Sequence, residues 1–158
     1  MSLASFAAAL PEGDRLLLDT TALAAYFDSS EATHPLARHL LAAFVASGRN
    51  SAVISMITVM EILVRPLRSS PPGHHTVLAF LRNHPNLEVV PVDLQVAQDA
   101  AFLRAAHRLS PPDALVVGTG LATQVGHLVT NDRKWTTRLA AMSERIRIVT
   151  LSDHLPFP

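Results

Sequence analysis

Short apolar runs alternate with longer amphipathic segments along this chain of 158 residues. The apolar runs are too short for helices and predict buried strands. They are residues 15–19, 51–54, 87–90, 127–130 and 146–150. Between them, apolar residues recur at helical spacing, as at Leu40, Leu41 and Phe44. Because strands that alternate with helices form a parallel sheet covered on both faces, we expect an α/β fold. It would be a three-layer α/β/α sandwich around a parallel sheet of about five strands.

Proline and glycine mark the expected breaks between elements. Helices are expected over residues 20–28, 34–47, 55–67, 74–83, 94–109, 110–123 and 133–142. Pro66 should kink or end its helix, because proline has no backbone N–H, and residues 71–73 (Pro-Pro-Gly) predict a loop. Residues 11–14 are turn-like. We therefore expect an N-terminal extension at residues 1–14 and one domain at residues 15–155.

Four acidic residues stand where a predicted strand ends or a helix begins. They are Asp19, Glu61, Asp113 and Asp132. The carboxyl ends of parallel strands meet at one edge of a sheet, where such folds bind ligands. Four carboxylates gathered there would repel one another unless a divalent cation neutralised them, and Mg²⁺ or Mn²⁺ suits oxygen ligands. The pattern indicates metal-dependent chemistry on phosphate esters.

Each acid also has a purely structural interpretation. Asp19 and Asp132 can cap helices, and Asp113 occupies the capping-box position of a helix that Ser110 would begin. Glu61 can pair with the arginine four residues later, which would contribute only about 0.3–0.5 kcal/mol. One such acid is weak evidence for a site. The four acids in this order favour function.

Composition narrows the class of protein. The chain has no cysteine, and its eight histidines include no HExxH-like pair, so disulfides and a zinc site are not expected. Its 13 basic and 13 acidic side chains balance, so net charge neither favours nor excludes nucleic acid. Residues 1–10 lack a basic leader region, and no apolar run approaches the roughly 18 residues of a membrane span. We expect a cytoplasmic protein without a membrane segment.

Four stretches together resemble the PIN-domain ribonucleases. They are Leu-Leu-Leu-Asp-Thr-Thr-Ala-Leu at 16–23, Ser55 with Glu61-Ile62, Pro-Asp-Ala-Leu-Val-Val at 112–117, and Leu-Val-Thr-Asn-Asp-Arg-Lys-Trp at 128–135. The order of the four stretches resembles in particular the order found in the VapC-type toxins of bacterial type II toxin–antitoxin systems. The resemblance spans roughly residues 15–150 and implies a PIN-like sandwich.

The resemblance also implies a site and partners. It assigns the four acids as the catalytic, metal-binding quartet: Asp19, Glu61, Asp113 and Asp132. Thr130, and Thr20 or Thr21, would be the supporting hydroxyl residues. The implied activity is hydrolysis of RNA phosphodiester bonds with Mg²⁺ or Mn²⁺. The implied partners are a VapB-like antitoxin and a second copy of the chain.

Some alternatives remain open. A catalytically inactive PIN-like scaffold that binds a partner protein or nucleic acid would keep the same fold. A toxin and a housekeeping nuclease are not separated by these residues, and neither is the RNA target. Met56 and Met60 are expected in the core, and Trp135 is expected to pack behind Asp132. Gly118 and Gly120 depart from the alanines common in this helix of the family, so we expect close helix packing there.

Overall fold

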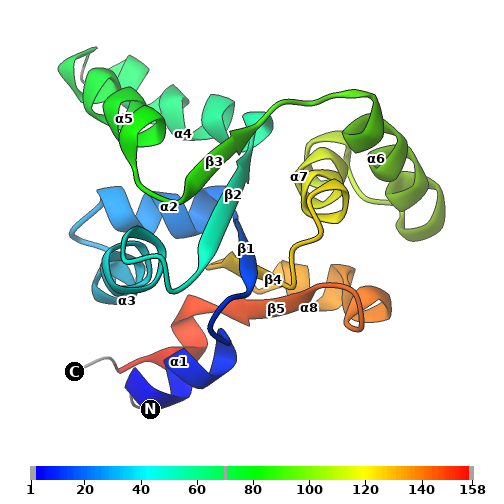
Figure 1. The fold of residues 1–158 in the computed structure, drawn as a ribbon. Coiled ribbons are helices and arrows are strands. Elements are labelled where there is room, and N and C mark those ends of the chain that lie inside the picture. The colour runs from blue at the N-terminus through cyan, green and yellow to red at the C-terminus, as the bar shows by residue number, and fades with distance from the viewer. Residues whose placement is uncertain (1–2, 70, 157–158) are drawn as a thin grey trace.

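The five strands expected from the sequence form one parallel sheet. The structure is a computed structural model and describes residues 3–69 and 71–156. Within these residues the sheet has five strands in the order β3-β2-β1-β4-β5, all parallel (Figure 1). The strands are β1 (Arg15–Leu18), β2 (Ser51–Ser55), β3 (Leu87–Val90), β4 (His127–Thr130) and β5 (Arg147–Thr150). At the centre, Leu17 pairs with Val53 of β2 and with Leu128 of β4.

Helices cover both faces of this sheet. They are α1 (Leu3–Ala9), α2 (Thr20–Phe27), α3 (His34–His39), α4 (Met56–Ser69), α5 (Pro71–Asn83), α6 (Leu94–His107), α7 (Pro111–Ala122) and α8 (Lys134–Arg138). Leu16 and Leu18 face a core cluster built with α1 to α5, and Leu17 faces a second cluster built with α6, α7 and α8. Figure 1 shows α6 and α7 on the opposite side of the strands from α2 and α3. The predicted three-layer α/β/α sandwich is confirmed.

Several element boundaries differ from the sequence expectation. The helix expected at 34–47 is α3 followed by a π-helical segment, Leu40–Ala46, and the helix expected at 133–142 is α8 followed by a 3₁₀ turn, Ala140–Met142. Pro66 lies inside α4 and does not end it. The prediction of a loop at residues 71–73 is wrong, because α5 begins at Pro71. Proline is tolerated in the first helical turn, where the backbone N–H has no intrahelical partner.

Residues before β1 share the core of the sheet. Phe6 and Leu10 are fully buried, and the Phe6 ring stacks on Phe44 with 5.5 Å between ring centroids. The Arg49 guanidinium donates to the carbonyl of Leu10 at 2.8 Å. The division into an extension at 1–14 and a domain at 15–155 stays a prediction. Among the described residues, no helix is both long and apolar enough to cross a membrane.

Gly118 allows α7 to approach α6 closely. A Cβ at Gly118 would lie 2.9 Å from the carbonyl oxygen of Val96 and 3.0 Å from the backbone nitrogen of Ala100. At Gly120 a Cβ would lie 3.0 Å from two side-chain atoms, one each of Leu17 and Val125. The close packing expected at these glycines is confirmed.

We expect Gly118→Ala to destabilise the fold more than Gly120→Ala. Alanine gains about 1 kcal/mol of helix propensity over glycine. Overpacking costs about 1–3 kcal/mol, and at Gly118 the opposing atoms are backbone that has to move as a unit. The net loss for G118A should be up to about 2 kcal/mol in the free energy of unfolding, measured by urea titration. Equal midpoints for the two variants would contradict the close approach of α6 and α7.

Buried histidines should make stability depend on pH. His127 is only 3% exposed, and burial lowers its pKa from the usual 6.5. The carboxylate of Asp14 lies 3.0 Å from Nδ1 of His127 and opposes this pKa shift, although the contact lacks hydrogen-bond geometry. The positive charge of Arg147 lowers the pKa of His127 further. Burial also lowers the pKa of His84 and of His154. At moderately acidic pH the unfolded chain therefore binds more protons than the folded protein.

We accordingly expect the free energy of unfolding to fall on acidification. The stabilisation from neutral histidines is fully present above the unfolded pKa of 6.5 and is lost as the pH falls through the lowered folded pKa values. Urea midpoints measured from pH 8 to pH 5 check this expectation. His127→Asn should flatten the curve. A midpoint that is constant or rises toward pH 5 would contradict it.

Candidate functional site

The candidate site lies at the carboxyl ends of the strands. Asp19 follows β1 directly, and Asp132 follows the neighbouring strand β4 after one residue. Glu61 lies in α4, the helix that begins where β2 ends. Asp113 lies in the first turn of α7. The topology thus places all four acids on elements that begin at or near one edge of the sheet.

Asp19 is a buried carboxylate with a one-sided set of hydrogen bonds. It is only 6% exposed. Its Oδ2 accepts hydrogen bonds from Thr21 Oγ1 at 2.8 Å, Thr130 Oγ1 at 2.9 Å and Trp135 Nε1 at 3.3 Å. The other oxygen, Oδ1, has no hydrogen-bond donor in the described part of the chain. Asp19 occupies the N-cap position of α2 but makes no side-chain capping bond. Capping therefore does not account for its burial.

Thr130 connects Asp19 to Asp132. Its Oγ1 donates to Asp19 and accepts from the backbone N–H of Asp132 at 3.0 Å. Oδ1 of Asp132 in turn accepts from the backbone N–H of Lys134 at 2.9 Å. The structural interpretation of Asp132 is correct in part, because one carboxylate oxygen closes the turn into α8. Its Oδ2 takes no such bond from any residue that the structure describes.

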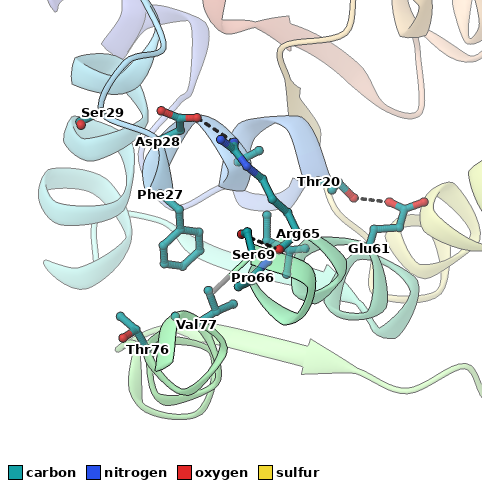
Figure 2. Close-up of a pocket in the computed structure, with 13 residues that line it drawn as sticks. Thr20, Phe27, Asp28, Ser29, Glu61, Arg65, Pro66, Ser69, Thr76 and Val77 are labelled. Carbon is teal, nitrogen blue, oxygen red and sulfur yellow. Dashed lines mark hydrogen bonds and ion pairs between the residues drawn. The ribbon is translucent and has the colours of Figure 1, made fainter. Parts of the chain in front are cut away.

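Glu61 points toward α2 and not along its own helix. Thr20 Oγ1 donates a short hydrogen bond to Glu61 Oε2 (Figure 2). The arginine one turn later, Arg65, pairs with Asp28 at 2.8 Å, so the Glu61–Arg65 pair of the structural interpretation is not formed. Hydrogen bonds from Ser30 and Arg65 lower the pKa of Asp28 to about 2.

A groove of about 530 Å³ runs beside Glu61 between α2, α4 and α5. Its walls combine apolar side chains with the polar groups of the two helices that face the site. They include Thr20, Ala24, Phe27, Ile62, Arg65 and Val77. Figure 2 shows Phe27 and Val77 at one end of this groove and the Thr20–Glu61 hydrogen bond at the other.

Asp113 is tied to α8 by an ion pair. Arg138 Nη1 lies 2.6 Å from Asp113 Oδ2, and both side chains are partly exposed. Ser110 Oγ accepts from the backbone N–H of Asp113 at 3.4 Å, so the capping interpretation is correct for Ser110. The Asp113 side chain does not complete a capping box, because it faces Arg138. Its Oδ1 carries no hydrogen bond within the described ranges.

The oxygen donors suit a divalent cation in their chemistry. Each of the four acids has one oxygen bonded to the protein and one without a donor among the described residues. Hard cations such as Mg²⁺ and Mn²⁺ prefer such carboxylate oxygens. The acids are not drawn into one cluster, because residues 3–69 and 71–156 hold no group of three or more potential ligands placed to bind a metal ion.

Comparisons with known proteins identify the family. A family model for the PIN domain matches residues 16–141. The chain belongs to the PIN domain family. The matched region of this PIN domain begins in β1 and contains all four acids, and the suspected resemblance is confirmed. No curated protein matches the chain.

Solved structures of toxin–antitoxin proteins, including a VapC toxin, are similar in fold to this PIN domain. A toxin–antitoxin complex from Klebsiella pneumoniae is 23% identical with a TM-score of 0.65, covering 87% of this chain and 97% of the other. The VapC20 toxin of Mycobacterium tuberculosis, which cleaves the sarcin-ricin loop, is 17% identical with a TM-score of 0.62, covering 78% and 93%. FitAcB from Neisseria gonorrhoeae is 17% identical with a TM-score of 0.66, covering 89% and 99%. At these identities the likeness concerns the fold.

The structure separates the two threonines that the resemblance left open and adds contacts of the PIN domain site that sequence reasoning missed. Thr21 bonds Asp19, and Thr20 bonds Glu61. Trp135 is buried as expected, yet it also donates to Asp19. Arg138 pairs with Asp113, a contact that the sequence did not predict. The sequence carries no signal for the last two contacts, because they join separate elements and leave the apolar pattern unchanged.

Proposed function

We propose that this PIN domain is a metal-dependent endoribonuclease that hydrolyses RNA phosphodiester bonds, and that it is the toxin of a toxin–antitoxin pair. The observation that carries the proposal is the burial of Asp19 together with its hydrogen bonds. It is a buried carboxylate at the carboxyl end of the central strand, with three donors on Oδ2 and an open Oδ1. A buried carboxylate with one oxygen lacking a partner favours a cation as its missing neighbour.

The four acids take distinct roles in the proposal. Asp19 and Asp113 hold the cation directly, each through the oxygen that has no protein donor. Glu61, oriented by Thr20, and Asp132, oriented by Lys134, use their open oxygens to orient the attacking water or to hold a second ion. When bound, Mg²⁺ or Mn²⁺ lowers the pKa of water and stabilises negative charge on the phosphate oxygens.

Cleavage assays on purified full-length chain test this proposal. Total RNA, transfer RNA and ribosomal RNA are incubated with Mg²⁺, with Mn²⁺ or with EDTA. Ribosomal RNA is included because VapC20, a structural neighbour, cleaves the sarcin-ricin loop. We expect discrete cuts with either cation and none with EDTA, since the carboxylates alone repel a phosphate. Cutting that survives EDTA would contradict the metal-dependent mechanism.

A VapB-like antitoxin is the proposed protein partner, acting with the toxin in the cytoplasm. Several structural neighbours are toxin–antitoxin complexes, including VapBC of Salmonella typhimurium bound to DNA. The groove beside Glu61 supports the proposal, because it joins apolar side chains to the edge of the acidic site. Co-expression with a small open reading frame next to the gene should suppress cleavage if it encodes the antitoxin.

A homodimer is proposed from the surface of α4. Met56 and Met60 were expected in the core, but this is wrong, because they are 43% and 56% exposed. They share an apolar stripe with Val64 and Leu67, which are 40% and 56% exposed. The four residues recur at helical spacing along one face of α4. An apolar stripe of this kind commonly lies at a protein interface.

A catalytically inactive scaffold is the second candidate. It is favoured by the ion pair between Asp113 and Arg138 and by the absence of a three-acid cluster from residues 3–69 and 71–156. A scaffold would bind neither Mg²⁺ nor Mn²⁺ at the acids. Calorimetric titration with Mn²⁺ therefore separates the two candidates without depending on the choice of RNA.

A further inference from the structure

Trp135 joins the core to the candidate site. Its side chain is 3% exposed and lies in the core cluster that contains Leu17 and Leu128. Its indole N–H donates to Asp19 Oδ2 at 3.3 Å, across 116 residues of sequence. Packing alone needs only the ring, but a buried indole N–H also needs an acceptor. Here that acceptor is the carboxylate that is expected to bind metal.

The three donors to Asp19 differ in how firmly they are directed. Thr21 and Thr130 each carry one hydroxyl hydrogen that can rotate. Their oxygens lie 3.1 Å apart, so either hydroxyl can donate to the other instead of to Asp19. The indole N–H of Trp135 has no such freedom, because its direction is fixed by a packed ring and indole offers no acceptor. Among the three donors to Asp19, Trp135 is therefore the one whose N–H direction is fixed by packing in the core.

This asymmetry determines which oxygen of Asp19 is available to a ligand. All three hydrogen bonds fall on Oδ2, and no described residue donates to Oδ1. A carboxylate held in this way offers Oδ1 as a single ligand atom in a fixed direction. Groups that hold metal ligands by hydrogen bonds commonly change metal affinity by about 10- to 100-fold.

The helix that carries Trp135 contacts a second acid. Trp135 and Arg138 both lie in α8, and Arg138 pairs with Asp113 at 2.6 Å. The turn into α8 is closed by Asp132 through the N–H of Lys134. Three of the four acids thus contact α8 or the turn that begins it. The indole bond to Asp19 fixes this helix to the end of β1.

We propose that Trp135 is a positioning residue, which holds Asp19 so that Oδ1 faces a divalent cation. The inference rests on the proposed function, in which Asp19 is a metal ligand. It assigns to the indole N–H a role beyond packing. Trp135→Phe keeps an aromatic ring in the core and removes only the donor and part of the ring volume.

Calorimetric titration of the full-length chain with Mn²⁺ tests this role. We expect Trp135→Phe to weaken Mn²⁺ binding by about 10-fold. The matched control is Leu139→Ala, which removes a side chain that is 1% exposed from the same core cluster and leaves the indole bond in place. Its unfolding midpoint in urea should fall while its Mn²⁺ affinity stays that of wild type. Unchanged affinity in Trp135→Phe, with Mn²⁺ bound by wild type, overturns the inference and leaves the proposed function standing.

Fluorescence gives a second readout that does not depend on the folding of Trp135→Phe. Trp135 is the only tryptophan in the chain. We expect paramagnetic Mn²⁺ to quench its emission with the dissociation constant found by calorimetry, and we expect no saturable quenching in Asp19→Asn. Calorimetric binding without quenching would place the cation away from Trp135 and overturn the inference. Failure of wild type to bind Mn²⁺ would overturn the inference and the proposed function together.

Discussion

Replacing Asp19 by Asn is expected to reduce RNA cleavage by about 10²- to 10³-fold, a loss of the size found when one group that stabilises a transition state is removed. Asparagine keeps the size of the side chain, and its Oδ1 can still accept from the donors that now bond Asp19 Oδ2. It removes the negative charge and puts an amide where the open oxygen stood. The measurement is the single-turnover cleavage rate at the Mn²⁺ concentration that saturates the wild type.

Asp99→Asn is the matched control for that variant. Asp99 is a half-buried acid in α6 that accepts a hydrogen bond from the Gln95 side chain and belongs to none of the contacts around Asp19. The same charge is removed, so any general effect on RNA affinity appears in both variants. Cleavage by Asp99→Asn should match wild type. Metal-dependent cleavage by Asp19→Asn at the wild-type rate would remove Asp19 from the mechanism.

The fold was predictable because strands and helices leave different periods in the sequence. The uninterrupted run Leu16, Leu17 and Leu18 indicated a strand buried on both faces. Leu17 indeed faces one core cluster, and its two neighbours face the other. The start of α5 was missed because Pro71 and Pro72 are equally compatible with a loop and with a first helical turn. Local sequence does not distinguish these two conformations.

The candidate site was predictable only as a set of residue types at strand ends. Asp19 and Asp132 were identified because each follows an apolar run, and the parallel topology places those run ends together. The resemblance named Thr130 as a supporting residue, but the hydrogen bonds that orient Asp19 were not predictable from the apolar pattern. Thr130 and Trp135 reach it across 111 and 116 residues, and such side-chain contacts carry no periodic pattern. Likewise, nothing in the sequence of α8 indicates that Arg138 pairs with Asp113.

Replacing Phe6 by Ala is expected to lower the free energy of unfolding by about 3–5 kcal/mol, the usual cost of truncating a buried phenylalanine. Phe6 is fully buried, and its ring contacts Phe44 and His154 with centroid distances of 5.5 Å and 5.1 Å. A seven-residue helix such as α1 is marginal by itself, so its order depends on this packing. Since domains are stable by only about 5–15 kcal/mol, the variant should be close to unfolding.

Phe102→Ala supplies the control for that loss, because Phe102 is 55% exposed on α6 and its truncation opens no cavity. It should change the free energy of unfolding by less than about 0.5 kcal/mol. Urea titration of both variants measures the difference. If Phe6→Ala unfolds at the same urea concentration as Phe102→Ala, residues 1–14 are a dispensable extension. A large loss in Phe6→Ala alone would instead make α1 an integral part of the core beneath β1, and the domain would then begin before residue 15.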